Sequence, residues 1–157
     1  MAQSDELCRD CRGVTRHFDS ARAVGVYEQK LRTGIIKFKY EGCRQLAAPF
    51  SYLLALYTRR FYELEKLDAI TYIPAHPQRY KQRGFNQAQL LASRLGSRLG
   101  LPVRFLIQRR QVTKPQSELS RRERYRNLAQ AFAPASNLVS GQNILIIDDI
   151  FTTGTTV

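Results

Sequence analysis

Apolar residues along this chain recur either at helical spacing or in short unbroken runs, a pattern typical of a fold that mixes helices with buried strands. Between residues 31 and 67 the spacing is helical, and we expect the stripe there to pack in the core without carrying chemistry. Pro49 interrupts this stretch, so we expect it in the first turn of a helix or at a kink. The stripe consists of Leu31, Ile35 and Phe38, followed after Gly42 by Leu46, Phe50, Leu53, Leu54, Tyr57, Phe61 and Leu64.

Short apolar runs predict the strands. Residues 69–74 predict one buried strand, stopped by Pro74, and Ile144 to Ile147 predict a second. No polar residue alternates within that second run, as expected of a parallel strand buried on both faces. Residues 102–108 predict a third strand, and residues 131–135 a short edge strand.

One helix between the strands carries clear end signals. Asn86 is a good N-cap, and Gly100 is a good residue to follow the last turn. Leu91, Leu95 and Leu99 should point inward from this helix. Strands alternating with helices predict an α/β fold: a Rossmann-like parallel sheet flanked by helices, with a small helical N-terminal part.

Composition and charge narrow the class of protein. The chain has 157 residues, enough for one domain with a core, and 43% of them are hydrophobic. No stretch is apolar for long enough to insert into a membrane, and the first residues do not form a secretory signal. Three cysteines without such a signal make the cytoplasm the expected compartment. The net charge of +12 favours phosphate-rich small molecules, nucleic acid, or both, and does not distinguish between them.

The strongest candidate site begins where the strand from Ile144 to Ile147 ends. Two carboxylates there could accept hydrogen bonds from a pair of sugar hydroxyls, or hold Mg²⁺ directly or through water. The hydroxyl-rich loop after them could bind a phosphate with its backbone N–H groups. The alternative is a buried strand followed by a polar turn, but adjacent acids at a strand end are costly without partners. The candidate residues are Asp148 and Asp149, then Thr152, Thr153, Gly154, Thr155 and Thr156.

Two basic segments offer further anion sites. Residues 75–86 should form a loop that leads into a helix N-terminus, which favours an anion; a solvated loop is the alternative. His76 in this loop could be an acid, a base or a surface residue. Residues 109–126 fit a flexible flap that closes over a phosphorylated ligand, or a strip along a nucleic-acid backbone, with a short helix at residues 117–128. The loop candidates are Pro74, Ala75, His76, Arg79, Lys81 and Arg83; the flap candidates are Arg109, Arg110, Lys114, Arg121, Arg122 and Arg124.

Cys8 and Cys11 form a C-x2-C pair, half of a structural zinc site. A second pair is absent from this sequence, and Cys43 and His17 are not at a diagnostic spacing. We therefore expect Zn²⁺ only if another cysteine pair is supplied.

These segments together resemble the ComF family, a relative of the type I phosphoribosyltransferases. The aliphatic run, Asp-Asp and Thr-Thr-Gly-x-Thr resemble the phosphoribosyl pyrophosphate (PRPP) motif of those enzymes. The most family-specific piece is Arg83-Gly-Phe-Asn-Gln87. Further matches are Ile73-Pro-Ala-His-Pro77, Leu91-Ala92, Lys114-Pro-Gln116, Leu119, Arg124, Asn127, Phe132, the Cys8–Cys11 pair, Tyr27 and Lys37-Phe-Lys-Tyr40.

The resemblance implies a phosphoribosyltransferase (pentosyltransferase) that binds PRPP with Mg²⁺ and takes part in natural competence. Asp148 and Asp149 would bind the ribose hydroxyls or the metal shell, Thr152 to Thr156 the 5′-phosphate, and the basic loop the pyrophosphate. It also implies a division into residues 1–30, the remainder of a cysteine region, and residues 31–157, a phosphoribosyltransferase-like domain. Relatives in that family have a first cysteine pair before this region and a helix and strand after it, so a chain shortened at both ends is expected.

The competing hypothesis is a basic module without catalytic activity. It would bind single-stranded DNA or a DNA-import protein, with the PRPP site vestigial or regulatory. DNA binding should weaken steeply with salt, whereas PRPP binding should depend on Mg²⁺, Asp148 and Asp149. The acceptor substrate and the oligomeric state stay open.

Overall fold

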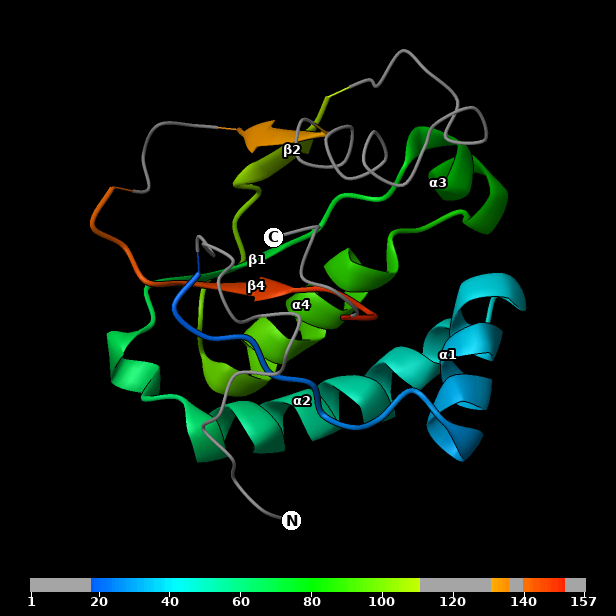
Figure 1. Cartoon of the computed structure of the whole chain (residues 1–157), viewed down its shortest axis with the longest axis horizontal. Coiled ribbons are helices and arrows are strands. Elements are labelled where there is room, and N and C mark those ends of the chain that lie inside the picture. Colours follow the sequence, from blue (N-terminus) through cyan, green and yellow to red (C-terminus); the bar gives the residue numbers. More distant parts are fainter. Residues whose placement is uncertain (1–17, 111–130, 136–139, 152–157) are drawn as a thin grey trace, which may run out of the picture.

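A computed structural model of the chain, shown in Figure 1, describes residues 18–110, 131–135 and 140–151. The elements follow one another in the order helix, helix, strand, helix, helix and three strands, with two short 3-10 turns between helices or before a strand. They are α1 (Gln29–Tyr40), η1 (Arg44–Leu46), α2 (Ala47–Phe61), η2 (Leu64–Lys66), β1 (Ala69–Tyr72), α3 (Pro77–Arg83), α4 (Gln87–Leu99), β2 (Ile107–Arg109), β3 (Phe132–Pro134) and β4 (Ile144–Ile147).

The centre of the fold is a parallel pair of strands. β1 pairs with β4 in a register that sets Ala69 opposite Ile144 and Tyr72 opposite Ile147. The start of the pair is held by Asp68, whose carboxylate accepts a hydrogen bond from the Asn143 N–H at 2.8 Å. The pairing joins segments far apart in sequence and confirms the predicted α/β fold with a parallel sheet.

The predicted third strand, residues 102–108, is only partly right. Its first half lies beside β1, where the Ile70 N–H donates to the Pro102 carbonyl at 2.9 Å and the Arg104 N–H donates to the Ile70 carbonyl at 2.9 Å. The Leu106 N–H then donates to the Thr71 hydroxyl at 3.4 Å and not to a strand carbonyl. The chain leaves the parallel sheet at this point, and β2 pairs antiparallel with β3, the predicted edge strand.

Beneath the parallel pair, α4 lies between the sheet and α2, while α3 lies above the pair at the upper right of Figure 1. Small residues form the buried face of α2 and let the two helices approach closely, which corrects part of the predicted stripe. Of the predicted stripe, Leu53 is instead 43% exposed, and its neighbours Tyr52 and Leu56, which the stripe did not include, are exposed as well. The buried face of α2 consists of Ala47, Ser51, Ala55 and Thr58.

Burial of β4 is less complete than expected. Of its residues, Ile147 alone is buried, at 4% exposed, while Ile144, Leu145 and Ile146 are half-buried. Ile147 joins a core with Ile70 of β1 and Leu95 of α4. The strand is therefore anchored most firmly at its carboxyl end, next to the predicted site.

Across the described part of the chain, every helix is either too short or too polar to cross a lipid bilayer.

Candidate functional site

Asp148 and Asp149 lie at the carboxyl end of β4, as the sequence predicted. Pairing with β1 continues one step past the strands, because the Ile73 N–H donates to the Ile147 carbonyl at 3.1 Å. The Asp149 N–H donates to Oδ1 of Asp148 at 2.8 Å. The two carboxyl groups are thus held beside each other at the edge of the sheet where ligands of α/β proteins bind.

Lys39 of α1 is a further member of this site; the sequence analysis included it in the matching segment Lys37-Phe-Lys-Tyr40 but gave it no role. Its Nζ lies 2.8 Å from Oδ1 of Asp149, and the two side chains are only 13% and 15% exposed. The neighbouring Phe38 is fully buried in the core and fixes this turn of α1. Lys39 directly follows a buried position of a predicted helix, but no signal in the sequence could have named Asp149 as its partner.

The acid pair carries more negative charge than its surroundings neutralise. Burial, and then the negative charge of Asp149, raise the pKa of Asp148 to about 6. The Asp149 N–H and Lys39 oppose this shift without cancelling it. At neutral pH two carboxylates therefore share one ammonium group, and further hydrogen-bond donors or positive charge would stabilise them.

The basic loop after β1 contains a short helix, α3, which corrects the prediction of a loop at residues 75–86. His76 caps the helix, since its Nδ1 accepts a hydrogen bond from the Gln78 N–H at 3.3 Å, and Pro77 supplies a fixed φ in the first turn. Gly84, with φ of +73°, ends it in the left-handed conformation that favours glycine. Pro74 and Ala75 connect β1 to this helix and are half-buried, while Arg79 and Lys81 are exposed on it.

The charges of Arg79 and Arg109 act on His76, and the charge of Arg79 acts on Arg109. Partial desolvation, together with the guanidinium groups of Arg109 and Arg79, lowers the pKa of His76, although the residue is exposed. Desolvation and the charge of Arg79 also lower the pKa of Arg109, which belongs to β2. The structure thus brings a flap candidate, Arg109, to two loop candidates. We call His76, Arg79 and Arg109 the basic cluster.

Arg83 faces α1. Its guanidinium lies 4.8 Å from the centroid of the Tyr40 ring, and its Nη1 donates to Oε1 of Gln87 at 3.1 Å. Gln87 is buried at 2% exposed. Arg83 therefore links α1 to the start of α4.

The rest of the Arg83–Gln87 segment builds the frame of the site. Arg44 donates to the Gly84 carbonyl at 2.8 Å and covers the Phe85 ring, which packs on Phe38. Asn86 confirms its predicted role as N-cap, since its Oδ1 accepts from the N–H groups of Ala88 at 3.0 Å and Gln89 at 3.4 Å. Its Nδ2 also donates to the Ile73 carbonyl at 3.1 Å, so one side chain joins α4 to the end of β1.

A metal site held by the protein needs several ligating side chains in one place. Among the described residues, no group of three or more His, Cys, Asp or Glu side chains could hold a metal. Asp149 already binds the Lys39 ammonium, so these donors do not fit a Mg²⁺ ion held by the protein alone. Such an ion would have to arrive with a ligand that supplies most of its oxygens.

Several predicted site residues lie outside the described residues. They are Cys8 and Cys11, the flap residues Lys114, Arg121, Arg122 and Arg124, and Thr152, Thr153, Gly154, Thr155 and Thr156 of the phosphate loop. Arg110 is described, is exposed, and donates its N–H to the Ala131 carbonyl at 2.7 Å.

Curated proteins similar to this chain are named for competence and DNA utilization. Competence protein F of Haemophilus influenzae is 30% identical over 155 residues, 95% of this chain and 68% of that protein. Competence protein ComFC of Bacillus subtilis is 31% identical over 96% of this chain and 62% of its own length. DNA utilization protein YhgH of Escherichia coli is 35% identical over 85% of this chain and 60% of its own length.

The chain spans between 60% and 68% of the length of these three relatives. No family model matches the sequence, and no solved structure matches it.

Proposed function

Because the chain belongs to the ComF family, we propose that it serves DNA uptake or use and does so through a site for a phosphorylated ribose, PRPP with Mg²⁺. The relatives' names, competence protein and DNA utilization protein, support the first part of this proposal. The acid pair at the carboxyl end of β4 supports the second.

The observation that carries the ligand class is the charge on the acid pair. Oδ1 of Asp148 accepts the Asp149 N–H, and Oδ1 of Asp149 binds Lys39. Both side chains are half-buried, so their carboxylate oxygens lie together at the end of the strand. Two neighbouring carboxylates match the two hydroxyls of a ribose. Hydrogen bonds donated by those hydroxyls would stabilise the charged form of Asp148, whose pKa is raised by burial and then by the charge of Asp149.

The reaction we propose is displacement of pyrophosphate from C1 of PRPP by a nucleophile. The sugar would develop positive charge as the bond to pyrophosphate breaks, so charge stabilisation rather than covalent chemistry would lower the barrier. Asp148 and Asp149 would orient the ribose through its hydroxyls. The basic cluster would bind the leaving pyrophosphate with its Mg²⁺, and the loop from Thr152 to Thr156 the 5′-phosphate.

The test is calorimetric titration of PRPP with Mg²⁺ into the chain and into the double variant Asp148→Asn/Asp149→Asn. Losing two charge-assisted hydrogen bonds should weaken binding by roughly a hundredfold or more. The control variant is Glu63→Gln/Glu65→Gln, which neutralises two exposed acids and should bind as the parent does. PRPP binding by Asp148→Asn/Asp149→Asn as tight as that by the parent chain would contradict the proposal.

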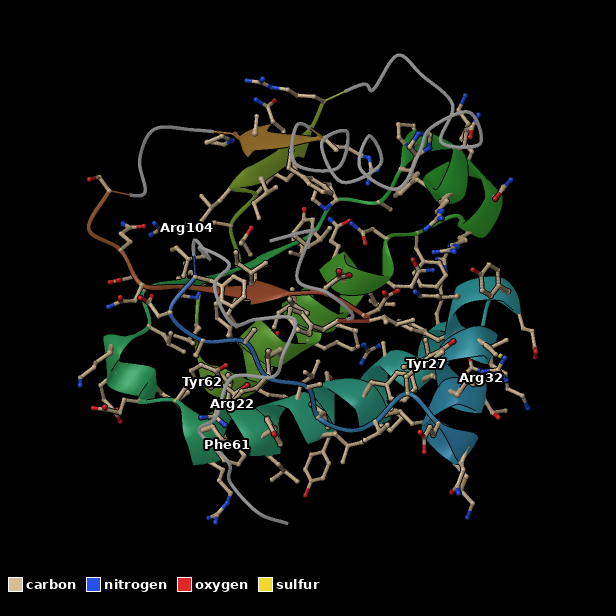
Figure 2. All side chains as sticks on the ribbon, in the orientation of Figure 1. Arg22, Tyr27, Arg32, Phe61, Tyr62 and Arg104 are labelled. Atoms are coloured by element: carbon tan, nitrogen blue, oxygen red, sulfur yellow. The ribbon has the colours of Figure 1, made fainter. Side chains whose placement is uncertain are left out.

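A second candidate function, single-stranded DNA binding, is favoured by the basic cluster and the net charge of +12. Base stacking has less support at the rings that guanidinium groups already cover; Figure 2 shows Arg22 beside Phe61, 4.8 Å from the ring centroid. DNA binding should then rest on phosphate contacts and weaken steeply between 50 and 200 mM salt, by about tenfold or more for several contacts. Asp148→Asn/Asp149→Asn removes two negative charges and should not weaken DNA binding, which separates it from PRPP binding.

A further inference from the structure

The acid pair has a cation of its own in the protein. Lys39 reaches it from α1, more than a hundred residues earlier in the chain, and binds Asp149 at 2.8 Å with both side chains largely buried. Exposed ion pairs exchange readily with water and salt, whereas a buried pair is screened much less. The ammonium is therefore part of the site.

The position of Lys39 is fixed by its neighbours. Phe38 packs against Phe50 at 5.7 Å and Phe85 at 5.5 Å between ring centroids. Tyr40, on the other side of Lys39 in sequence, lies against the Arg83 guanidinium. The helix is intact at this end, since the Glu41 N–H donates to the Lys37 carbonyl at 3.0 Å. The backbone of Lys39 thus cannot withdraw from the acids without disturbing the core.

We propose that Lys39 is the resident counter-ion of the acid pair and that it excludes free divalent cations from Asp148 and Asp149. A divalent ion bridging both carboxylates would sit beside a buried ammonium group and be repelled by it. It would also have to displace Lys39 from an oxygen of Asp149. Neutral hydroxyls meet neither obstacle, because a carboxylate can accept several hydrogen bonds and Lys39 can stay in place while the hydroxyls donate.

This inference deepens the proposed function: Asp148 and Asp149 bind the ribose hydroxyls, and the metal binds the pyrophosphate. It rests on that function only for the identity of the hydroxyl ligand. The exclusion of metal follows from Lys39 and the acids alone, so the two claims can fail separately.

The experiment titrates Mn²⁺ alone into the whole chain and measures free Mn²⁺ by electron paramagnetic resonance. The variants are Lys39→Met, the charge-conserving Lys39→Arg, and Lys37→Met, which removes an exposed lysine from the same helix. Lys39→Met should bind Mn²⁺ at least about tenfold more tightly than the parent chain. Lys39→Arg and Lys37→Met should behave like the parent, and adding Asp148→Asn/Asp149→Asn to Lys39→Met should abolish the gain.

Equal Mn²⁺ binding by the parent and Lys39→Met would overturn the proposal, as would a gain that survives removal of both acids. Circular dichroism checks that Lys39→Met is folded, and Lys39→Gln, which can still hydrogen-bond to Asp149, takes its place if it is not. The same proteins are also titrated with ribose 5-phosphate in the presence of a chelator that removes divalent metal ions. Failure of the parent to bind ribose 5-phosphate, with the Mn²⁺ result intact, would count against the phosphoribosyl site and leave the role of Lys39 standing.

Discussion

The two parallel strands end in contrasting surroundings. The segment after β1 is held by side-chain hydrogen bonds: Asn86 donates to the Ile73 carbonyl and caps α4, and Arg44 donates to the carbonyl of Gly84. The end of β4 leaves two carboxylates with one ammonium group, and the pKa of Asp148 is raised to about 6. The first end is arranged for stability, and the second retains unfavourable charge that a ligand could relieve.

This contrast separates the residues that build the site from those that use it. A change at the β1 end or in α1 beneath it should cost stability, whether or not a ligand is present. A change in the acid pair should cost binding while leaving the fold intact or stronger.

The largest effect is expected from Phe38→Ala. The ring is fully buried between Phe50 and Phe85, so its removal leaves a cavity beneath both strand ends and should lower the free energy of unfolding by about 3–5 kcal/mol. Urea denaturation measures the change. Phe105→Ala is the control, since Phe105 is 55% exposed and should cost less than about 1 kcal/mol. Equal losses of unfolding free energy in the two variants would contradict the assignment of Phe38 to the core.

Asn86→Ala should come next, at about 2–3 kcal/mol. It removes the N-cap of α4 and leaves the Ile73 carbonyl without its donor. Asn86→Asp separates the two roles, because a carboxylate keeps the cap and loses the donor. Denaturation should place Asn86→Asp between the parent and Asn86→Ala; if it were as stable as the parent, the link to β1 would contribute nothing.

Asp148→Asn should act in the opposite direction and stabilise the protein in the absence of ligand. The pKa of Asp148 rises from 3.8 to about 6 on folding, so the folded state holds this proton more tightly than the unfolded state. Stability from this group is therefore present below about pH 4 and is lost as pH rises through about 6. The variant should be more stable than the parent by at most about 3 kcal/mol at pH 7.5.

Unfolding of both proteins across pH 4 to 8 measures this effect. The advantage of Asp148→Asn should shrink as the pH is lowered, because protonation removes the charge in the parent. An advantage that did not change with pH would show that charge on Asp148 is not its cause.

The smallest effect is expected from Arg83→Lys. It keeps the charge but loses the planar contact with Tyr40 and the hydrogen bond to Gln87, at a cost of about 1 kcal/mol. Arg79→Lys, at an exposed position of α3, should change stability by less than half as much. Denaturation curves that coincide for Arg83→Lys and the parent would show that this link between α1 and α4 is not needed for stability.

Local signals predicted the frame of this protein well. Residues 69–72 and 144–147 form strands, Asn86 caps α4, and Gly100 ends it, because apolar runs and caps act on neighbours in sequence. The position of the acid pair could be predicted because residues that directly follow a strand lie at its carboxyl end, where ligands of α/β folds bind.

Signals that depend on partners were missed or misread. The buried face of α2 is made of small residues such as Ala55, whereas hydrophobicity pointed to Leu53, which is exposed. Small residues fit there because α4 packs closely against α2. The sequence of α2 alone does not reveal that α4 is its neighbour. Residues 102–108 were predicted as one strand, but the chain leaves the parallel sheet at Leu106, whose N–H donates to the Thr71 hydroxyl. Lys39 meets Asp149 only in the folded protein.

The most direct test of the contrast between the two strand ends is one thermal melting experiment at pH 7.5. The parent chain and Asp148→Asn are melted without ligand and again with PRPP and Mg²⁺. We predict that the variant melts at the higher temperature without ligand, and that the ligand raises the melting temperature of the parent but not of the variant. A variant that melts no higher than the parent without ligand, or that gains as much from the ligand, would contradict the account.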